Sequence, residues 1–114
     1  MAAFGFVVPL VAGKTDAWRK AVAEMQGPRR QAYLASRKAL GIHRELISLQ
    51  TTPMGDMVVV HMEADDQKSV MPGMFAGTRE FDTWFRETVL VDAHGLDPKA
   101  APPPPVEVLA DIVR

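Results

Sequence analysis

The chain has 114 residues, a formal net charge of −1 and 47% hydrophobic residues. These values are typical of one globular domain, which we expect to cover residues 1–114, and they exclude a largely disordered chain. The one basic cluster, Arg29-Arg30 followed by Arg37-Lys38, is expected on a solvated helix face. Because nucleic-acid binding requires a larger basic surface, we expect no nucleic-acid partner.

The absence of cysteine removes several chemistries. Disulfides, thiolate nucleophiles and cysteine-ligated metal sites are all excluded. The apolar stretch over residues 1–13 lacks a positively charged start and is shorter than a membrane span. We therefore interpret it as a strand and expect a cytoplasmic protein with no membrane partner.

The first third of the chain predicts a strand followed by helical segments. Phe4–Val11 is apolar at nearly every position, which is typical of a strand covered on both faces. A helix is expected after the capping residue Thr15 or Asp16. Pro28 interrupts the helical pattern, and it either kinks one long helix or starts a second helix that ends before Gly41.

The middle of the chain predicts a β-hairpin. Two apolar-rich runs flank the sequence Thr-Pro-Met-Gly-Asp at residues 52–56. Proline presets the backbone for a tight turn, and glycine takes the left-handed conformation that such a turn requires. Ile42–Thr51 and Met57–Glu63 are therefore predicted to be its two strands.

The last third predicts a helix and a final strand. A polar, irregular stretch after the hairpin is expected to hold only a short helical turn that stops at Met71-Pro72-Gly73. Apolar residues from Thr78 to Val91 recur at helical spacing. Beyond the proline run at residues 102–105, the alternation over Val106–Ile112 predicts a strand.

These elements follow the order β–α–β–β–α–β, which is the ferredoxin-like arrangement. The predicted fold class is therefore α+β, with a four-stranded antiparallel sheet that carries its helices on one face. The first and third strands are apolar on both faces, so the second face of the sheet also needs to be covered. The simplest cover is another copy of the chain, and we expect a homodimer.

The order of elements, the hairpin, the aromatic second helix and the terminal strand resemble the dimeric α+β barrel superfamily over about residues 4–112. The stretch GIHRELISLQTTPMGD, with VVHME after it, also resembles small uncharacterised members of that superfamily. Members include antibiotic-biosynthesis-monooxygenase-like proteins, stress-responsive barrel proteins, small heme-degrading enzymes and polyketide cyclases. The resemblance implies a dimeric barrel that holds a flat organic ligand between sheet and helices.

If Thr52 lies opposite Asp56, the hairpin places four ionisable side chains on one sheet face: His43, Glu45, His61 and Glu63. A one-residue shift at the turn would break this grouping. One interpretation is that His61 lies between sheet and helices as a general base, with Glu45 or His43 supporting it. The alternative is that His61 is a partly buried histidine at the dimer interface with no catalytic role.

Aromatic side chains are expected to wall the space between helices and sheet: Trp18, Tyr33, Phe81, Trp84 and Phe85. The alternative is that aromatic residues at helical spacing only fill the hydrophobic core and bind no ligand. An apolar cavity with one or two polar groups is the usual design of a small-molecule site. Trp84, Phe81 and Tyr33 are therefore candidate substrate-binding residues, and Arg37 is a candidate partner for an acidic ligand.

No metal site is predicted, because a His-x-Glu pattern on two strands spreads its ligands too widely and is not diagnostic. No cofactor is expected either. Heme is an alternative, since some members of the superfamily bind it through a histidine near the second helix, where this chain has His94. The other interpretation of His94 is a contact with the negative end of that helix.

The sequence thus predicts a homodimer that binds a small molecule. Whether it is an enzyme stays open at this stage. One hypothesis is a cofactor-independent monooxygenase-like or cyclase-like enzyme that acts on an aromatic or polyketide-like substrate. The alternatives are a non-catalytic ligand-binding or structural dimer, and a heme-binding protein.

Overall fold

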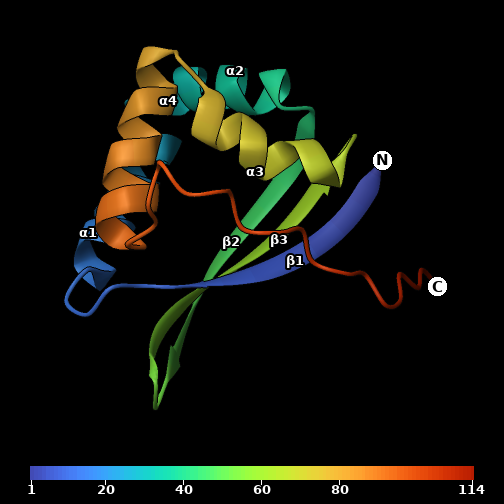
Figure 1. Cartoon of the computed structure of the whole chain (residues 1–114), viewed down its shortest axis with the longest axis horizontal. Helices are drawn as coiled ribbons and strands as arrows, with labels where there is room; N and C mark the ends of the chain where they lie inside the picture. Colours follow the sequence, from blue (N-terminus) through green and yellow to red (C-terminus); the bar gives the residue numbers. More distant parts are fainter.

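A computed structural model describes all 114 residues (Figure 1). The elements, in chain order, are β1 (Ala2–Pro9), α1 (Thr15–Gln26), α2 (Arg30–Ala39), β2 (Ile42–Thr52), β3 (Gly55–Ala64), α3 (Gln67–Ala76), α4 (Glu80–Phe85) and η1 (Arg86–Ala93). The segment η1 is a π-helical continuation of α4. None of the helices is long and apolar enough to cross a membrane.

The three strands form one antiparallel sheet in the order β1-β3-β2. The helices all lie on one side of this sheet, which leaves its other face uncovered (Figure 1). The predicted α+β class is confirmed. The sheet has three strands where the sequence predicted four.

The core lies between the sheet and the helices. In β3 the buried residues alternate, and Val58, Val60 and Met62 all face the helices. Phe4 pairs with Met62 from β1 and is buried beside it. The helices contribute the other large members of the core: Trp18, Met25, Val70, Met74, Phe81, Phe85, Val89 and Leu90.

Pro28 separates two helices and does not kink one. Helix α1 ends at Gln26 and α2 begins at Arg30, so the missing N–H of Pro28 falls in the turn between them. Gly41 follows α2 with a φ of +71°, the left-handed conformation that glycine adopts at little cost. The predicted glycine at the end of this helix is confirmed.

Helix α3 is longer than the predicted turn. The side chain of Asp66 caps it by accepting a hydrogen bond from the backbone N–H of Lys68 at 3.1 Å. The helix continues past Pro72, although an interior proline removes a backbone hydrogen bond. Val70 and Met74 are 1% and 6% exposed, and their burial offsets that loss. The prediction that the helix stops at Pro72 is therefore wrong.

The hairpin turn is one residue tighter than predicted. Thr52 pairs with Gly55 and not with Asp56, so only Pro53 and Met54 form the loop. Thr52 Oγ1 accepts a hydrogen bond from the N–H of Met54 at 3.1 Å and donates to the Gly55 carbonyl at 2.7 Å. Because of this shift, each side chain of β2 shares a sheet face with different β3 side chains from those predicted.

Residues 101–114 contain no helix or strand. The predicted strand Val106–Ile112 is not a strand in the single chain, because no neighbouring backbone pairs with it. One side-chain bond holds the start of the segment, where Gln67 Nε2 donates to the Val106 carbonyl at 2.8 Å. Figure 1 shows that the chain passes β1 and then projects away from the body.

The alternation along β3 predicts different responses at two neighbouring valines. Val58 is 1% exposed beneath the helices, whereas Val59 points to the uncovered face. Val58→Ala should lower the free energy of unfolding by about 1.5–3 kcal/mol, because it leaves a cavity. Val59→Ala, the matched control, should lower it by less than about 1 kcal/mol in dilute protein. Urea denaturation measures both, and equal losses would contradict these faces.

Candidate functional site

An apolar cavity of about 300 Å³ lies between the sheet and the helices. Its floor is formed by β1 and β3, through Phe4, Phe6, Val58 and Val60. Helix α3 and the segment η1 contribute the opposite wall, and 16 of the 23 lining residues are hydrophobic. A mostly apolar cavity of this size lies at the lower end of the range for small-molecule sites.

Three polar side chains reach the wall of this cavity: Glu45, Gln67 and His94. Glu45 pairs across the sheet with Met62, which pairs with Phe4. His94 contacts Pro9, at the other end of β1. Phe4 and Pro9 are separated by about 17 Å along an extended strand. The carboxylate of Glu45 and the imidazole of His94 therefore lie near opposite ends of the cavity.

The π-helical segment η1 brings the second of these groups to the cavity. The N–H of His94 donates to the Val89 carbonyl at 3.0 Å, an i to i−5 bond that makes the helix wider than an α-helix. Val89 and Leu90, which are 1% and 5% exposed, line the cavity beside His94. Such segments are frequent at functional sites, but apolar spacing predicted only a regular helix here.

The hydrogen bond from His94 to Pro9 determines which ring nitrogen carries the proton in the neutral form. Nδ1 lies 2.9 Å from the Pro9 carbonyl oxygen, and because a carbonyl only accepts, Nδ1 carries the proton. Burial lowers the pKa of His94, an effect that the bond to Pro9 partly opposes. The ring packs against Trp18, with 5.3 Å between ring centroids. Because its pKa is lowered, His94 is mainly neutral near pH 7, and with the proton on Nδ1 its Nε2 keeps a lone pair.

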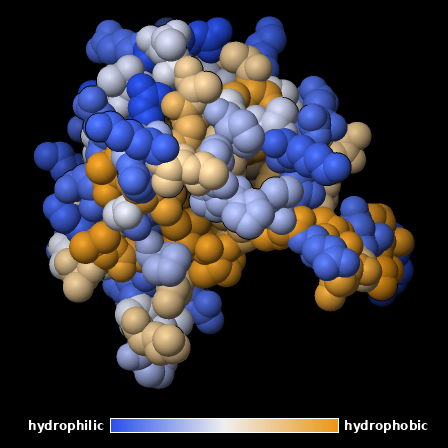
Figure 2. Space-filling model, in the orientation of Figure 1, coloured by the Kyte–Doolittle hydropathy of each residue, from blue (hydrophilic) through white to orange (hydrophobic).

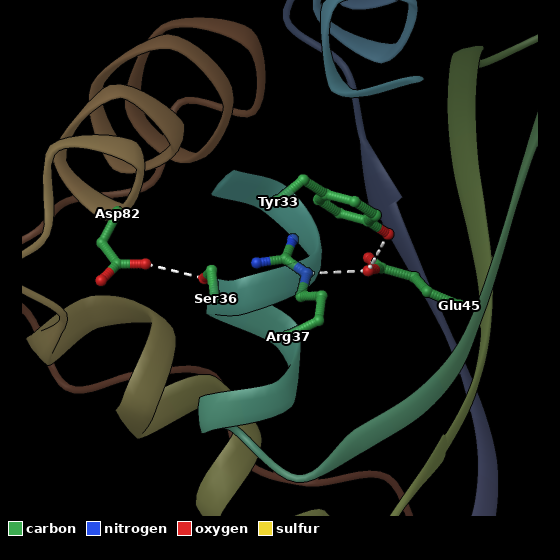
Figure 3. Close-up of polar contacts among 5 residues, drawn as sticks. All are labelled: Tyr33, Ser36, Arg37, Glu45 and Asp82. Carbon is green, nitrogen blue, oxygen red and sulfur yellow. Dashed lines mark hydrogen bonds and ion pairs between the residues drawn. The ribbon is translucent and has the colours of Figure 1, made fainter. Parts of the chain in front are cut away.

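At the other end, two side chains from α2 converge on Glu45 of β2 (Figure 3). The Tyr33 hydroxyl donates to Glu45 Oε1 at 2.6 Å, and Arg37 Nε donates to the same oxygen at 2.8 Å. The side chains of Arg37 and Glu45 are only 4% and 7% exposed. Burial, together with the charge of Glu45, raises the pKa of Tyr33, so its hydroxyl stays protonated and donates.

The Arg37 guanidinium is held mostly by aromatic rings. Its Cζ lies 4.5 Å from the ring centroid of Phe85 and 4.9 Å from that of Tyr33. Its Nη2 is buried without a hydrogen-bond partner. On the other side of α2, the Ser36 hydroxyl donates to Asp82 Oδ1 at 2.7 Å and ties α2 to α4 (Figure 3). The polar contacts of α2 therefore fix both of its neighbours.

A second, more open hollow of about 570 Å³ lies at the corner between α2 and β2. Glu45 borders both hollows, and Tyr33 and Arg37 border this one. His43 lies at its rim, in a β-bulge, with Nε2 2.7 Å from Asp65 Oδ1. Six of its ten lining residues are Arg, Lys, His, Asp or Glu, so this hollow suits a charged or polar group better than an apolar body.

The structure separates the predicted histidines and glutamates. His61 pairs with Leu46, so it points to the uncovered face of the sheet together with Glu63, whereas Glu45 points to the helices. His43 is exposed at the bulge. The prediction that His61 lies between sheet and helices is wrong, because the buried Val58, Val60 and Met62 take the helix side of β3 and His61 alternates with them. The tighter turn in addition places Leu46, and not Glu45, on the face that carries His61.

Two of the aromatic residues expected to wall a pocket, Trp18 and Phe85, do line the cavity. Phe81 and Trp84 do not. Phe81 is 4% exposed and packs against Trp84 and Tyr33, with ring centroids 5.5 and 5.9 Å away. These two residues therefore support the core beside the cavity, and Tyr33 reaches it only through Glu45.

No three His, Asp or Glu side chains gather closely enough to hold a metal ion. Comparisons of the chain with protein-family models, with curated proteins and with solved structures found no match. The candidate site is therefore defined by the geometry of the cavity and by the two polar groups near its ends.

The buried pair at the cavity wall predicts strong energetic coupling. Arg37→Met or Glu45→Leu alone should lower the free energy of unfolding by about 3–5 kcal/mol, because each leaves one buried charge without its partner. The double variant Arg37→Met/Glu45→Leu should lose clearly less than the sum of the two. A double-mutant cycle in urea measures this coupling, and additive losses would show that the pair is not coupled.

Proposed function

We propose that this protein binds a small, largely apolar or aromatic molecule in the cavity between its sheet and its helices. The observation that carries the proposal is the cavity itself, about 300 Å³ of mainly hydrophobic surface with a few polar side chains. Sites for organic molecules are built in this way, because apolar walls supply affinity and a few polar groups set the orientation. The volume suits a molecule of one or two rings.

The second part of the proposal concerns chemistry at the His94 end. A neutral imidazole with an unprotonated Nε2 is a proton acceptor, and His94 is among the residues that line this mainly hydrophobic cavity. It could take a proton from an acidic O–H or C–H group of a bound aromatic or polyketide-like molecule. The resulting anion could react with O₂ or cyclise, as in cofactor-independent monooxygenase-like or cyclase-like enzymes. In this proposal His94 takes the role of general base that we had expected of His61.

A ferredoxin-like subunit of a dimeric α+β barrel remains our proposal for the assembly. The order β1-β3-β2, with helices on one face, supports it. The uncovered face carries Val7 and Leu46, which are 57% and 49% exposed, with Val59 between their strands. A second copy packed on this face would remove these side chains from water, which favours a homodimer.

Filling the cavity should weaken binding without changing the outer surface. Val60→Phe places a ring in the cavity, whereas Val59→Phe places the same ring on the uncovered face of the same strand. Titration with an environment-sensitive apolar dye should show one site per chain in the wild type and in Val59→Phe. In Val60→Phe the dye affinity should fall about 10-fold or more, because about 1.4 kcal/mol of contact is lost.

Equal dye binding by Val60→Phe and Val59→Phe would overturn the proposed site. Hemin is the probe for the heme alternative, since His94 Nε2 is a possible axial ligand. A Soret band that appears with hemin and disappears in His94→Ala would replace the small-molecule proposal with a heme-binding one.

The half-buried, neutral state of His94 predicts how stability depends on pH. Because burial lowers its pKa in the folded protein, the unfolded chain binds a proton first as pH falls below about 6.5. The wild type should therefore lose stability relative to His94→Gln between about pH 7 and the lowered pKa. Both proteins share every carboxylate, so the difference between their urea-denaturation profiles isolates His94. Parallel profiles would mean that His94 is not buried as a neutral ring.

A further inference from the structure

The C-terminal segment over residues 106–113 carries apolar side chains that contact little of the protein. Leu109, Ile112 and Val113 are 88–89% exposed, and Val108 is 45% exposed. Figure 2 shows this projecting segment with hydrophobic residues on its surface. A chain end that is only a flexible tail is normally polar, so this composition indicates a segment that is buried against something.

The segment has the pattern of a strand but no partner strand. Its sequence, VEVLADIV, alternates at its start and contains β-branched residues at four of eight positions. The proline run at residues 102–105 holds the preceding chain extended. The bond from Gln67 to the Val106 carbonyl fixes the point at which the segment leaves the body.

The sheet offers a free edge for such a strand. Strand β1 pairs with β3 on one side only, and no backbone hydrogen bond reaches Ala2–Val8 from the other side. The sequence of β1, AAFGFVVP, contains no charged residue. Natural edge strands usually carry charges, bulges or a cover that prevents pairing with another chain, and this edge has no charge to do so.

We propose that the C-terminal segment of each chain adds as a strand to the free edge of β1 in a second copy of the protein. Each chain has one strand-like segment without a partner and one unprotected edge, so a two-fold exchange satisfies both in a closed dimer. The chain's own segment passes its own β1 without forming a ladder. The second copy is therefore the partner that completes a four-stranded sheet.

The exchange would also complete the cavity. Val8 and Pro9 of β1 line the cavity, and so do residues 103–106 of the same chain. A strand added along β1 would lie against this side, so the partner copy would contribute part of the wall. This consequence for the cavity wall rests on the proposed function. The strand exchange itself does not depend on the proposed function.

Proline variants test the ladder. Either Val108 or Leu109 must present its N–H to β1, since neighbouring residues of a strand point their backbone groups in opposite directions. Val108→Pro or Leu109→Pro should therefore raise the dimer dissociation constant about 10-fold or more, because the bond is lost in both copies. Val108→Thr and Leu109→Thr keep the N–H and are the matched controls. Sedimentation equilibrium measures all four against the wild type.

Cysteine variants test which chain supplies the strand. The protein has no cysteine, so one copy can carry Val7→Cys and another a cysteine scanned over residues 107–111. Mixed under mild oxidation, the two copies should form a disulfide-linked heterodimer at one register or two. A chain with both cysteines that closes only an internal disulfide in dilute solution would overturn the exchange.

A monomeric wild type, or a dimer that both proline variants leave unchanged, would also overturn the inference. Dye binding by the same variants separates this result from the proposed function. If the dye binds the wild type and the dimer is insensitive to proline, the site stands and the exchange fails. If the dimer is sensitive and no dye binds, the exchange stands and the proposed site fails.

Discussion

The pairing of β2 with β3 determines which side chains meet inside this molecule. A two-residue loop places Thr52 opposite Gly55, and every pair along the two strands follows from that contact. Glu45 consequently shares the helix side of the sheet with Met62, and Leu46 shares the uncovered face with His61. Had the loop contained one more residue, the carboxylate would point out of the core and the chain would lose the polar end of its cavity.

The position of Glu45 then constrains the helices. A buried carboxylate needs donors, and Tyr33 and Arg37 supply them from one face of α2. Ser36, on the other side of the same helix, bonds to Asp82 and fixes α4. Because α4 continues into η1, these contacts also fix the position of the helical segment that brings His94 to the opposite end of the cavity.

Local signals in the sequence predicted much of the fold. The glycine after the second helical segment and the two strands of the hairpin each follow from one dominant local effect, and the structure shows both. Pro28 allowed either a kink or two helices, and the structure has two helices. The passage of α3 through Pro72 could not be predicted, because burial of distant residues outweighs the local penalty. The choice between Asp56 and Gly55 as the partner of Thr52 depends on one turn geometry, which neither composition nor periodicity specifies.

The candidate site, like the fold, could be predicted from the sequence only in part. Its aromatic walls at Trp18 and Phe85 follow from helical spacing, but the importance of His94 depends on a π-helical turn and on a bond to Pro9, 85 residues away.

Native mass spectrometry of freshly purified protein tests the central claim, that the cavity binds a small molecule, most directly. We predict that each chain carries, or takes up from an apolar cell extract, one small organic molecule. Chains that stay free of added mass under both conditions would contradict the account.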